Sequence, residues 1–295
     1  MKKIIELHWL LICFFIFFSC KSVNDESINC GASSGKIFKT TMFPAKGVIV
    51  LVHGLNTKPS KMGDDKSEGT LAKMFLEAGY HVYRVTLPGH SGEITEMQNI
   101  KSQVWLNSAL SQYREAAETA DKDDIPIYLA AFSLGAAVYL NLMISGEDAA
   151  FEKMVLFAPA VAAKRIARNG IYAADIFSND RTIIASKAPA EYRAQRGVSI
   201  SAYKALFELE DNLNKHEFVN CNIPALVFID HDDELISISA LRRNINNFNL
   251  TNWIVETISN AGAKINPKYH HLIIDDKSLS PETWNFICKK ILYFL

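Results

Sequence analysis

Six runs of apolar, often β-branched residues recur along this chain, and helical patterns separate most of them. The first run reads GVIVLVH, a continuous pattern typical of a strand that is buried on both faces. The six runs occupy residues 47–53, 81–87, 125–132, 153–160, 223–230 and 252–258. Strands that alternate with helices indicate right-handed crossovers. The pattern therefore predicts an α/β fold with a mostly parallel sheet flanked by helices.

Residues 161–222 interrupt this alternation. They are long, helical in composition and without a clear buried run. We interpret them as a helical cap or lid, inserted over one end of the sheet. The core then consists of residues 36–160 and 223–295.

The N-terminus differs from the rest of the chain. Two lysines precede a short apolar stretch, and the small residue Ser19 follows it, which is the anatomy of a secretory signal peptide over residues 1–19. The apolar stretch, residues 9–18, is shorter than the roughly 18 residues that a membrane span needs.

The cysteine that follows Ser19 makes this segment similar to a bacterial lipoprotein signal peptide. The resemblance implies cleavage before Cys20, lipid attachment to that residue and a polar tether over residues 20–35. The protein would then be exported and anchored by lipid to a membrane of the bacterial cell envelope. Phe17 stands where such signals usually have an aliphatic residue, so an ordinary cleaved signal or an uncleaved short anchor stays open.

Charge and motif content exclude several other classes. A formal net charge of −1 and the lack of a dense basic stripe argue against a nucleic-acid partner. No cofactor motif is present, so we expect no cofactor. We also expect no metal, because neither the adjacent His270 and His271 nor the turn at residues 230–232 has a matching ligand group.

The third apolar run ends in a serine, within the sequence AFSLG. Ser133 in this setting resembles the G-x-S-x-G nucleophile elbow of the α/β-hydrolase family, in which a strained strand-to-helix turn exposes the serine. Gly135 supplies the second small residue, while Ala131 replaces the first glycine. The alternative is a serine that serves only as a helix N-cap.

The resemblance implies that an acid and then a histidine follow the serine in the chain. The acid of such proteins lies in a turn a few residues past a strand, with apolar residues behind it. Asp233 matches this placement best, ahead of Asp232 and then Asp230. The carboxylate would orient the histidine that accepts the serine's proton.

Two adjacent histidines follow the last strand. We favour His270 as the base, because Asp275 then stands where an acidic residue often follows in lipase-like members. With His271 as the base, which is the alternative, Asp275 would occupy a position that is usually apolar.

An oxyanion hole is implied in the same way. The Leu134 N–H follows the nucleophile, and the HGL sequence after the first strand implies the Leu55 N–H as the second donor. His53 is better explained as a structural hydrogen-bonding residue. The PGHSG loop at residues 88–92 matches the family's glycine- and histidine-containing loop, with no chemical role assigned.

Among α/β-hydrolases the resemblance is to lysophospholipase, monoacylglycerol lipase and carboxylesterase members. It implies a serine hydrolase that cleaves a small acyl ester or lipid (lysophospholipid, monoacylglycerol or short acyl ester) through an acyl-enzyme. The alternatives are a thioesterase or peptidase that uses the same triad, and a non-catalytic surface lipoprotein that binds a ligand.

Overall fold

The computed structural model describes residues 34–146, 149–260, 263 and 269–295. The expected signal peptide, Cys20 and most of the tether lie outside these residues. Within the described ranges, no helix has both the length and the apolar character needed to cross a membrane.

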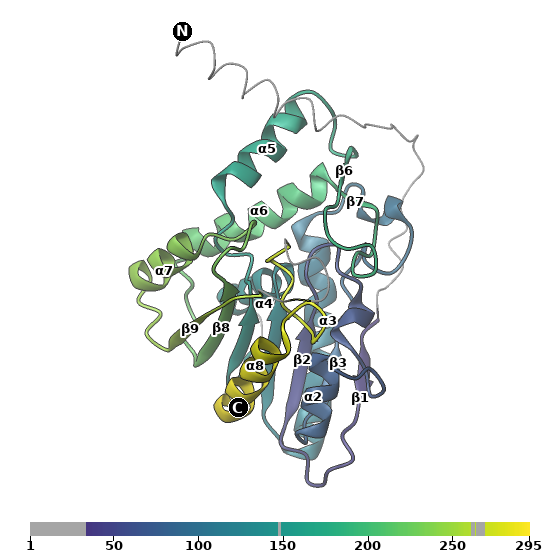
Figure 1. Ribbon diagram of the computed structural model, residues 1–295, viewed down its shortest axis with the longest axis vertical. Coiled ribbons are helices and arrows are strands. Elements are labelled where there is room, and N and C mark those ends of the chain that lie inside the picture. The colour runs from purple at the N-terminus through teal and green to yellow at the C-terminus, as the bar shows by residue number, and fades with distance from the viewer. Residues whose placement is uncertain (1–33, 147–148, 261–262, 264–268) are drawn as a thin grey trace.

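A seven-stranded sheet forms the centre of the molecule, in the order β1-β3-β2-β4-β5-β8-β9 (Figure 1). β1 pairs antiparallel with β3, and every other neighbouring pair is parallel, as the alternation predicts. The six predicted strands are all present, whereas the three-residue β1 was too short to show a pattern. The strands are β1 (Lys36–Phe38), β2 (Val48–Val52), β3 (His81–Arg84), β4 (Ile127–Phe132), β5 (Met154–Phe157), β8 (Ala225–Asp230) and β9 (Trp253–Ile258).

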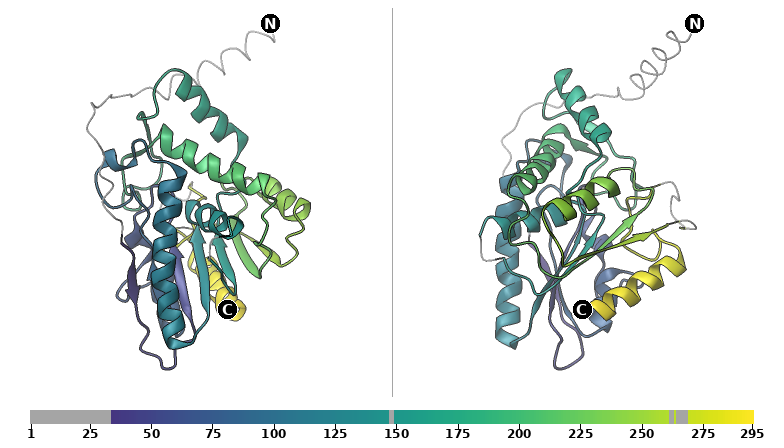
Figure 2. Two further views of the ribbon diagram at one scale, coloured as in Figure 1. Left: turned by 180° about the vertical axis from the view of Figure 1, so that it is seen from behind. Right: turned by 90° about the vertical axis from the view of Figure 1, so that its left-hand side faces the viewer.

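Helices cover both faces of the sheet (Figure 2). α2 (Leu71–Glu77) and α8 (Pro281–Phe294) pack on one face, and α3 (Ser102–Asp123), α4 (Leu134–Ile144) and α7 (Ile238–Asn247) on the other. Val50 of β2 faces α3 and α4, while the next residue, Leu51, faces α2 and α8. Both faces of a central strand are therefore buried, which explains its unbroken apolar sequence.

The sequence also encodes where these helices begin. The Ser280 side chain accepts a hydrogen bond from the Thr283 N–H at the start of α8, and Pro281 occupies the first turn, as its sequence predicts. The Thr70 side chain caps α2 in the same way. Two short 3-10 helices, Pro59–Met62 and Ile94–Met97, lie in the loops that follow β2 and β3.

The insertion between β5 and β8 contains α5 (Arg165–Ile176), β6 (Ile183–Ala185), β7 (Gly197–Ser199) and α6 (Ile200–Lys215). Figure 1 shows α5 and α6 stacked beyond one end of the sheet. A bridge between Ala163 and Ile236 ties the insertion to the loop after β8, at the carboxyl ends of the strands. The antiparallel β6–β7 ribbon was not predicted from the helical composition.

Candidate active site

Ser133 stands at the junction of β4 and α4 in a strained turn. Its φ angle is 50° and its ψ angle −110°, a conformation that a residue with a side chain rarely adopts. Its N–H donates to the Phe157 carbonyl at 2.9 Å, and its own carbonyl accepts the Ala160 N–H at 3.1 Å. These bonds to the end of β5 and to the loop after it fix the turn. The Ser133 side chain makes no capping hydrogen bond to α4, so a capping role does not explain the serine.

Gly135 allows this turn to approach β2. A Cβ atom on Gly135 would lie 2.7 Å from Cγ1 of Val52 and 2.9 Å from the carbonyl oxygen of His53. Both distances are shorter than a normal contact, so only glycine fits there. The alanine two residues before the serine, Ala131, is fully buried and is accommodated without a glycine.

His271 lies between Ser133 and Asp233. Its Nε2 atom is 2.9 Å from the Ser133 Oγ atom, and its Nδ1 atom is 2.8 Å from Oδ2 of Asp233. All three residues are buried, with at most 6% of their surface exposed. The contacts form one continuous chain from hydroxyl to imidazole to carboxylate, which is the arrangement that activates a serine.

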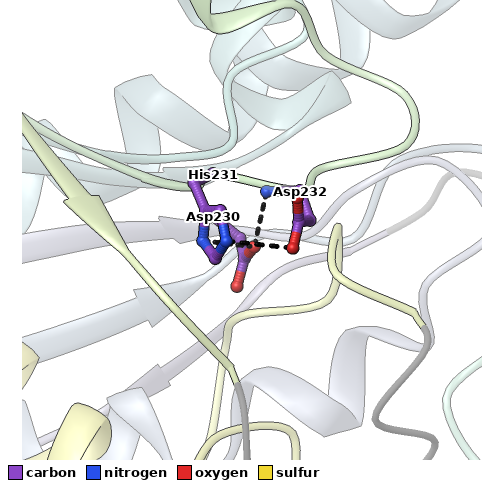
Figure 3. A group of neighbouring side chains, drawn as sticks. All are labelled: Asp230, His231 and Asp232. Carbon is purple, nitrogen blue, oxygen red and sulfur yellow. Dashed lines mark hydrogen bonds and ion pairs between the residues drawn. The ribbon is translucent and has the colours of Figure 1, made fainter.

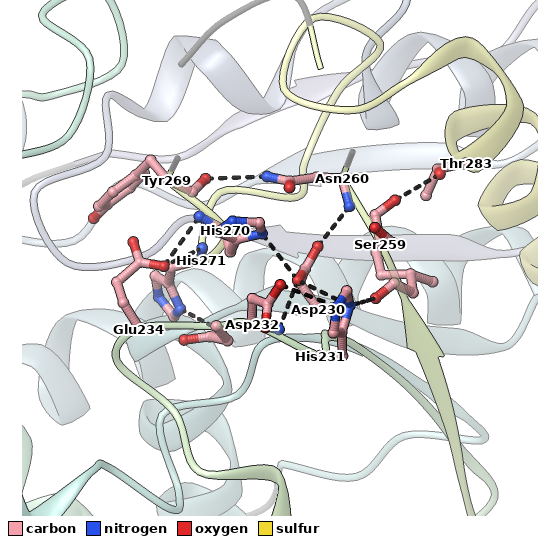
Figure 4. Close-up of polar contacts among 12 residues, drawn as sticks. Asp230, His231, Asp232, Glu234, Ser259, Asn260, Tyr269, His270, His271 and Thr283 are labelled. Atoms are coloured by element: carbon pink, nitrogen blue, oxygen red, sulfur yellow. Dashed lines mark hydrogen bonds and ion pairs between the residues drawn. The ribbon is translucent and has the colours of Figure 1, made fainter. Parts of the chain in front are cut away.

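The expectation that His270 faces Ser133 is wrong. The His270 ring turns the other way, and its Nδ1 atom lies 3.1 Å from Oδ1 of Asp230 (Figure 4). The preference for His270 rested on Asp275, which seemed unsuited to an inward position. Asp275 is in fact buried, where the Tyr192 hydroxyl and the Ser278 N–H both donate to its carboxylate. A buried acid with such partners is compatible with an apolar neighbourhood.

Glu234 holds the backbone of both histidines. Its Oε2 atom accepts the N–H of His270 at 3.0 Å and the N–H of His271 at 3.1 Å (Figure 4). Its Oε1 atom is buried and has no partner among the described residues. Burial raises the pKa of the Glu234 carboxyl above its usual value.

Of the three candidate acids, the structure brings Asp233 to the histidine. Its Oδ1 atom accepts the N–H groups of Leu235 and Ile236, at 2.8 and 2.7 Å, which leaves Oδ2 for His271. The Asp232 side chain is 58% exposed and contacts His231, while Asp230 pairs with His270. The last residue of β8 and the turn after it thus each aim one carboxylate at one of the two adjacent histidines.

Charge and burial have opposite effects on the pKa values of His271 and Asp233. Burial disfavours the charged form of His271, but the Asp233 carboxylate and then Glu234 outweigh it, so the pKa of His271 is raised above 6.5. Burial would raise the pKa of Asp233, yet His271 and the two N–H donors lower it below its usual value. Asp233 is thus ionised at neutral pH, and its negative charge favours the protonated form of His271.

The loop after β2 lies against the serine turn. A Cβ atom on Gly54 would lie 2.7 Å from the Phe132 ring and 3.1 Å from Cβ of Ser133. Within the part of the chain that the structure describes, the N–H groups of Leu55 and Leu134 donate to no protein acceptor. These are the two N–H groups that the resemblance implies as oxyanion donors.

Two buried histidines hold this loop. The Leu87 N–H donates to Nε2 of His53 at 3.1 Å, and the Asn56 N–H donates to Nε2 of His90 at 3.0 Å. These acceptor roles require neutral rings. Burial lowers the pKa of His90 to about 4, and burial together with the neighbouring His90 lowers that of His53. His53 is therefore structural, as predicted, and the loop at residues 88–92 supplies a support through His90.

One group in the described ranges brings three possible metal-binding side chains together, namely Asp230, His231 and Asp232 (Figure 3). The buried Asp230 carboxylate already accepts the Asp232 N–H, the Asn260 N–H and the His270 ring. Both of its carboxylate oxygens therefore already accept hydrogen bonds, which connect the segments that carry Asp232, Asn260 and His270.

The roles of Glu234, Asn56 and Tyr192 were not predicted from the sequence. In the sequence, Glu234 is one of several neighbouring acidic residues at the end of β8, and nothing in the pattern distinguishes it from the others. The partners of Asn56 and Tyr192 lie 139 and 83 residues away along the chain, so no local pattern could identify them.

Comparisons with known proteins agree with this architecture. The family model described as "Serine aminopeptidase, S33" matches residues 44–262. No protein with a curated description matches the chain by sequence.

Solved structures similar to this chain include lipolytic enzymes. A soluble variant of monoglyceride lipase from Saccharomyces cerevisiae, in complex with a substrate analog, has a TM-score of 0.69 at 10% identity, over 94% of this chain and 95% of that one. A structure described with the metagenome-derived lipolytic enzymes LipS and LipT has a TM-score of 0.67 at 18% identity, over 89% and 97%. The monoacylglycerol lipase of Paleococcus ferrophilus gives 0.63 at 16% identity, over 89% and 99%. At these identities the likeness shows the α/β-hydrolase fold alone.

Proposed function

Since the chain belongs to the serine aminopeptidase S33 family and is an α/β-hydrolase, we propose that it cleaves carboxylic esters through an acyl-enzyme on Ser133. The observation that carries the proposal is the chain of contacts from Ser133 Oγ through His271 to Asp233, at 2.9 and 2.8 Å. A ligand-binding protein has no need of this arrangement, whereas acyl transfer does.

In the proposed reaction, Ser133 Oγ attacks the ester carbonyl carbon while His271 Nε2 takes the hydroxyl proton. The Leu55 and Leu134 N–H groups donate to the resulting oxyanion. The imidazolium, stabilised by Asp233, then protonates the departing alcohol, which leaves an acyl-serine. A water molecule, deprotonated by His271, attacks the acyl carbon, and collapse of the second intermediate releases the acid and returns the proton to Ser133.

The substrates that we propose are monoacylglycerols, lysophospholipids or short acyl esters. The monoglyceride lipase and the lipolytic enzymes among the similar structures support this class. The insertion supports it too, since no residue of α5 is buried and Ile166, Ile176 and the adjacent Phe177 are 81, 78 and 64% exposed. Such side chains suit a molecule with an acyl chain.

A substrate panel tests the reaction class. Purified protein that starts at Lys21 is assayed with chromogenic esters of increasing acyl length, a thioester and aminoacyl or peptide substrates, with Ser133→Ala as the control. We expect the esters to give the highest kcat/KM and the variant to be inactive. Faster turnover of a thioester or a peptide would replace the ester proposal. A folded protein that turns over nothing would favour the ligand-binding alternative.

We further propose export and lipid attachment at Cys20, which would hold the enzyme at a membrane of the cell envelope. The support is the anatomy of residues 1–20. Full-length protein expressed in a bacterium should partition into the detergent phase of a phase-separating detergent, and Cys20→Ser should move it to the aqueous phase. Equal partitioning of the two would contradict lipid attachment.

A further inference from the structure

Residues 192–195, which we call the strap, belong to the part of the insertion that connects β6 to β7. They run beside the loop after β2. The Lys58 N–H donates to the Tyr192 carbonyl at 2.7 Å, and the Ala194 N–H donates to the Asn56 carbonyl at 2.8 Å. A bridge between Thr57 and Arg193 lies between these two bonds. The strap is therefore a short antiparallel partner of the turn that carries Leu55.

Asn56 extends this pairing with its side chain. Its amide group donates to the Gln195 carbonyl at 3.0 Å, and its Oδ1 atom accepts the Gln195 N–H at 2.7 Å. The side chain thus imitates a strand peptide, while the Asn56 N–H is held by His90. The φ angle of Asn56 is 58°, which asparagine tolerates better than most residues. Every polar group of the residue next to Leu55 is thereby fixed.

The other end of the strap reaches the histidine loop. The Tyr192 hydroxyl lies 2.7 Å from Oδ2 and 2.9 Å from Oδ1 of Asp275, four residues after His271. Tyr192 and Asp275 are only 1 and 3% exposed. A phenol that donates to a buried carboxylate is a strong and directional contact. This contact gives the histidine loop a fixed point on the insertion.

We propose that the strap is a positioning element of the acyl-transfer site, which holds the turn of Leu55 through Asn56 and the loop of His271 through Tyr192. This inference rests on the proposed function. Neither Asn56 nor Tyr192 touches the reacting atoms. They act by fixing an oxyanion donor and a base whose placement must hold to within a fraction of an ångström.

A positioning role differs measurably from a stabilising one. An oxyanion donor acts on the transition state, so its displacement lowers kcat and leaves KM nearly unchanged. A contact that only stabilises the fold lowers the melting temperature without changing kcat per active site at a temperature well below unfolding.

Two variants test the strap. Asn56→Gly keeps the left-handed backbone and removes the amide contacts, and Tyr192→Phe removes a single hydroxyl. Tyr113→Phe is the matched control, because it deletes a buried hydroxyl bonded to the backbone of Ala150, away from the site. The readouts are kcat and KM on the best ester, with active sites titrated by a fluorophosphonate, and the melting temperature.

We expect Asn56→Gly and Tyr192→Phe each to lower kcat about tenfold or more, part of the roughly 100- to 1000-fold that loss of an oxyanion donor costs. KM should stay within about twofold, and Tyr113→Phe should keep full kcat. Unchanged kcat in both strap variants of an active enzyme would overturn the strap's role alone. A wild-type protein that neither turns over any substrate nor reacts with the fluorophosphonate would overturn the proposed function, and the strap's role with it.

Discussion

The Nε2 atom of His271 lies 2.9 Å from the Oγ atom of Ser133. His271 is thus placed to take the serine's proton, and we predict that His271→Ala lowers kcat about 10²- to 10⁴-fold, the usual contribution of a general base. Steady-state kinetics on a chromogenic ester measures this loss.

His270→Ala is the matched control for that variant. It removes the contact to Asp230, so we expect a lower melting temperature and a free energy of unfolding reduced by about 1–3 kcal/mol, because a buried carboxylate loses a partner. The kcat should fall less than tenfold. If His270→Ala were the inactive variant and His271→Ala the active one, the assignment of the base would be wrong.

The pH dependence follows from the raised pKa of His271. A general base must be neutral to accept a proton. We therefore expect kcat/KM to increase with pH along an acid limb whose pKa lies above 6.5, and to be low at pH values below that pKa. Asp233→Asn removes the main charge that raises this pKa, so the acid limb should move to lower pH while kcat falls about 10³- to 10⁴-fold. An unmoved acid limb would show that another group controls it.

The same shift has a consequence for stability. Because the folded pKa of His271 lies above its unfolded value, the stabilisation contributed by His271 is fully present below about pH 6.5. This contribution is lost as the pH rises through the folded pKa. The Asp233 pKa is lowered, so its contribution is present at neutral pH and is lost as the pH falls through its folded value.

Glu234 supports the base in two separable ways, through its acceptor oxygen and through its charge. Glu234→Gln keeps an oxygen for the N–H groups of His270 and His271, so kcat should stay within a few-fold. The loss of charge should still move the acid limb of kcat/KM to lower pH, since Glu234 helps to raise the pKa of His271. Glu234→Ala loses both and should lower kcat about tenfold, as a buried N–H left without an acceptor shifts the loop. Equal kinetics of the two variants would mean that the acceptor oxygen has no role.

Substitution of Gly54 tests how closely the turn that carries Leu55 must pack against Phe132. Gly54→Ala would place a methyl group 2.7 Å from the Phe132 ring, which costs about 1–3 kcal/mol of stability or displaces the turn. We expect kcat to fall about tenfold or more with little change in KM, because Leu55 moves with Gly54. A variant with wild-type kcat and melting temperature would show that the turn accommodates the extra methyl group, and that close packing at Gly54 is not required.

Much of this architecture was predictable from local patterns. The buried strands, the serine turn and the choice of Asp233 each depend on a few neighbouring residues, and the structure places Ser133 and Asp233 on either side of one histidine. Which histidine this is could not be predicted, because the orientation of the loop is set by Asp230 and Glu234, about 40 residues away. Asp275 was misleading for the same reason, since its partner Tyr192 belongs to the insertion.

The role of Ser133 as nucleophile is tested most directly by labelling the protein that starts at Lys21 with a fluorophosphonate and locating the modified peptide by mass spectrometry. We predict a single label on Ser133, absent from Ser133→Ala, strongly slowed in His271→Ala and retained in His270→Ala. A folded wild-type protein that takes no label, or one that carries the label on another residue, would contradict that role.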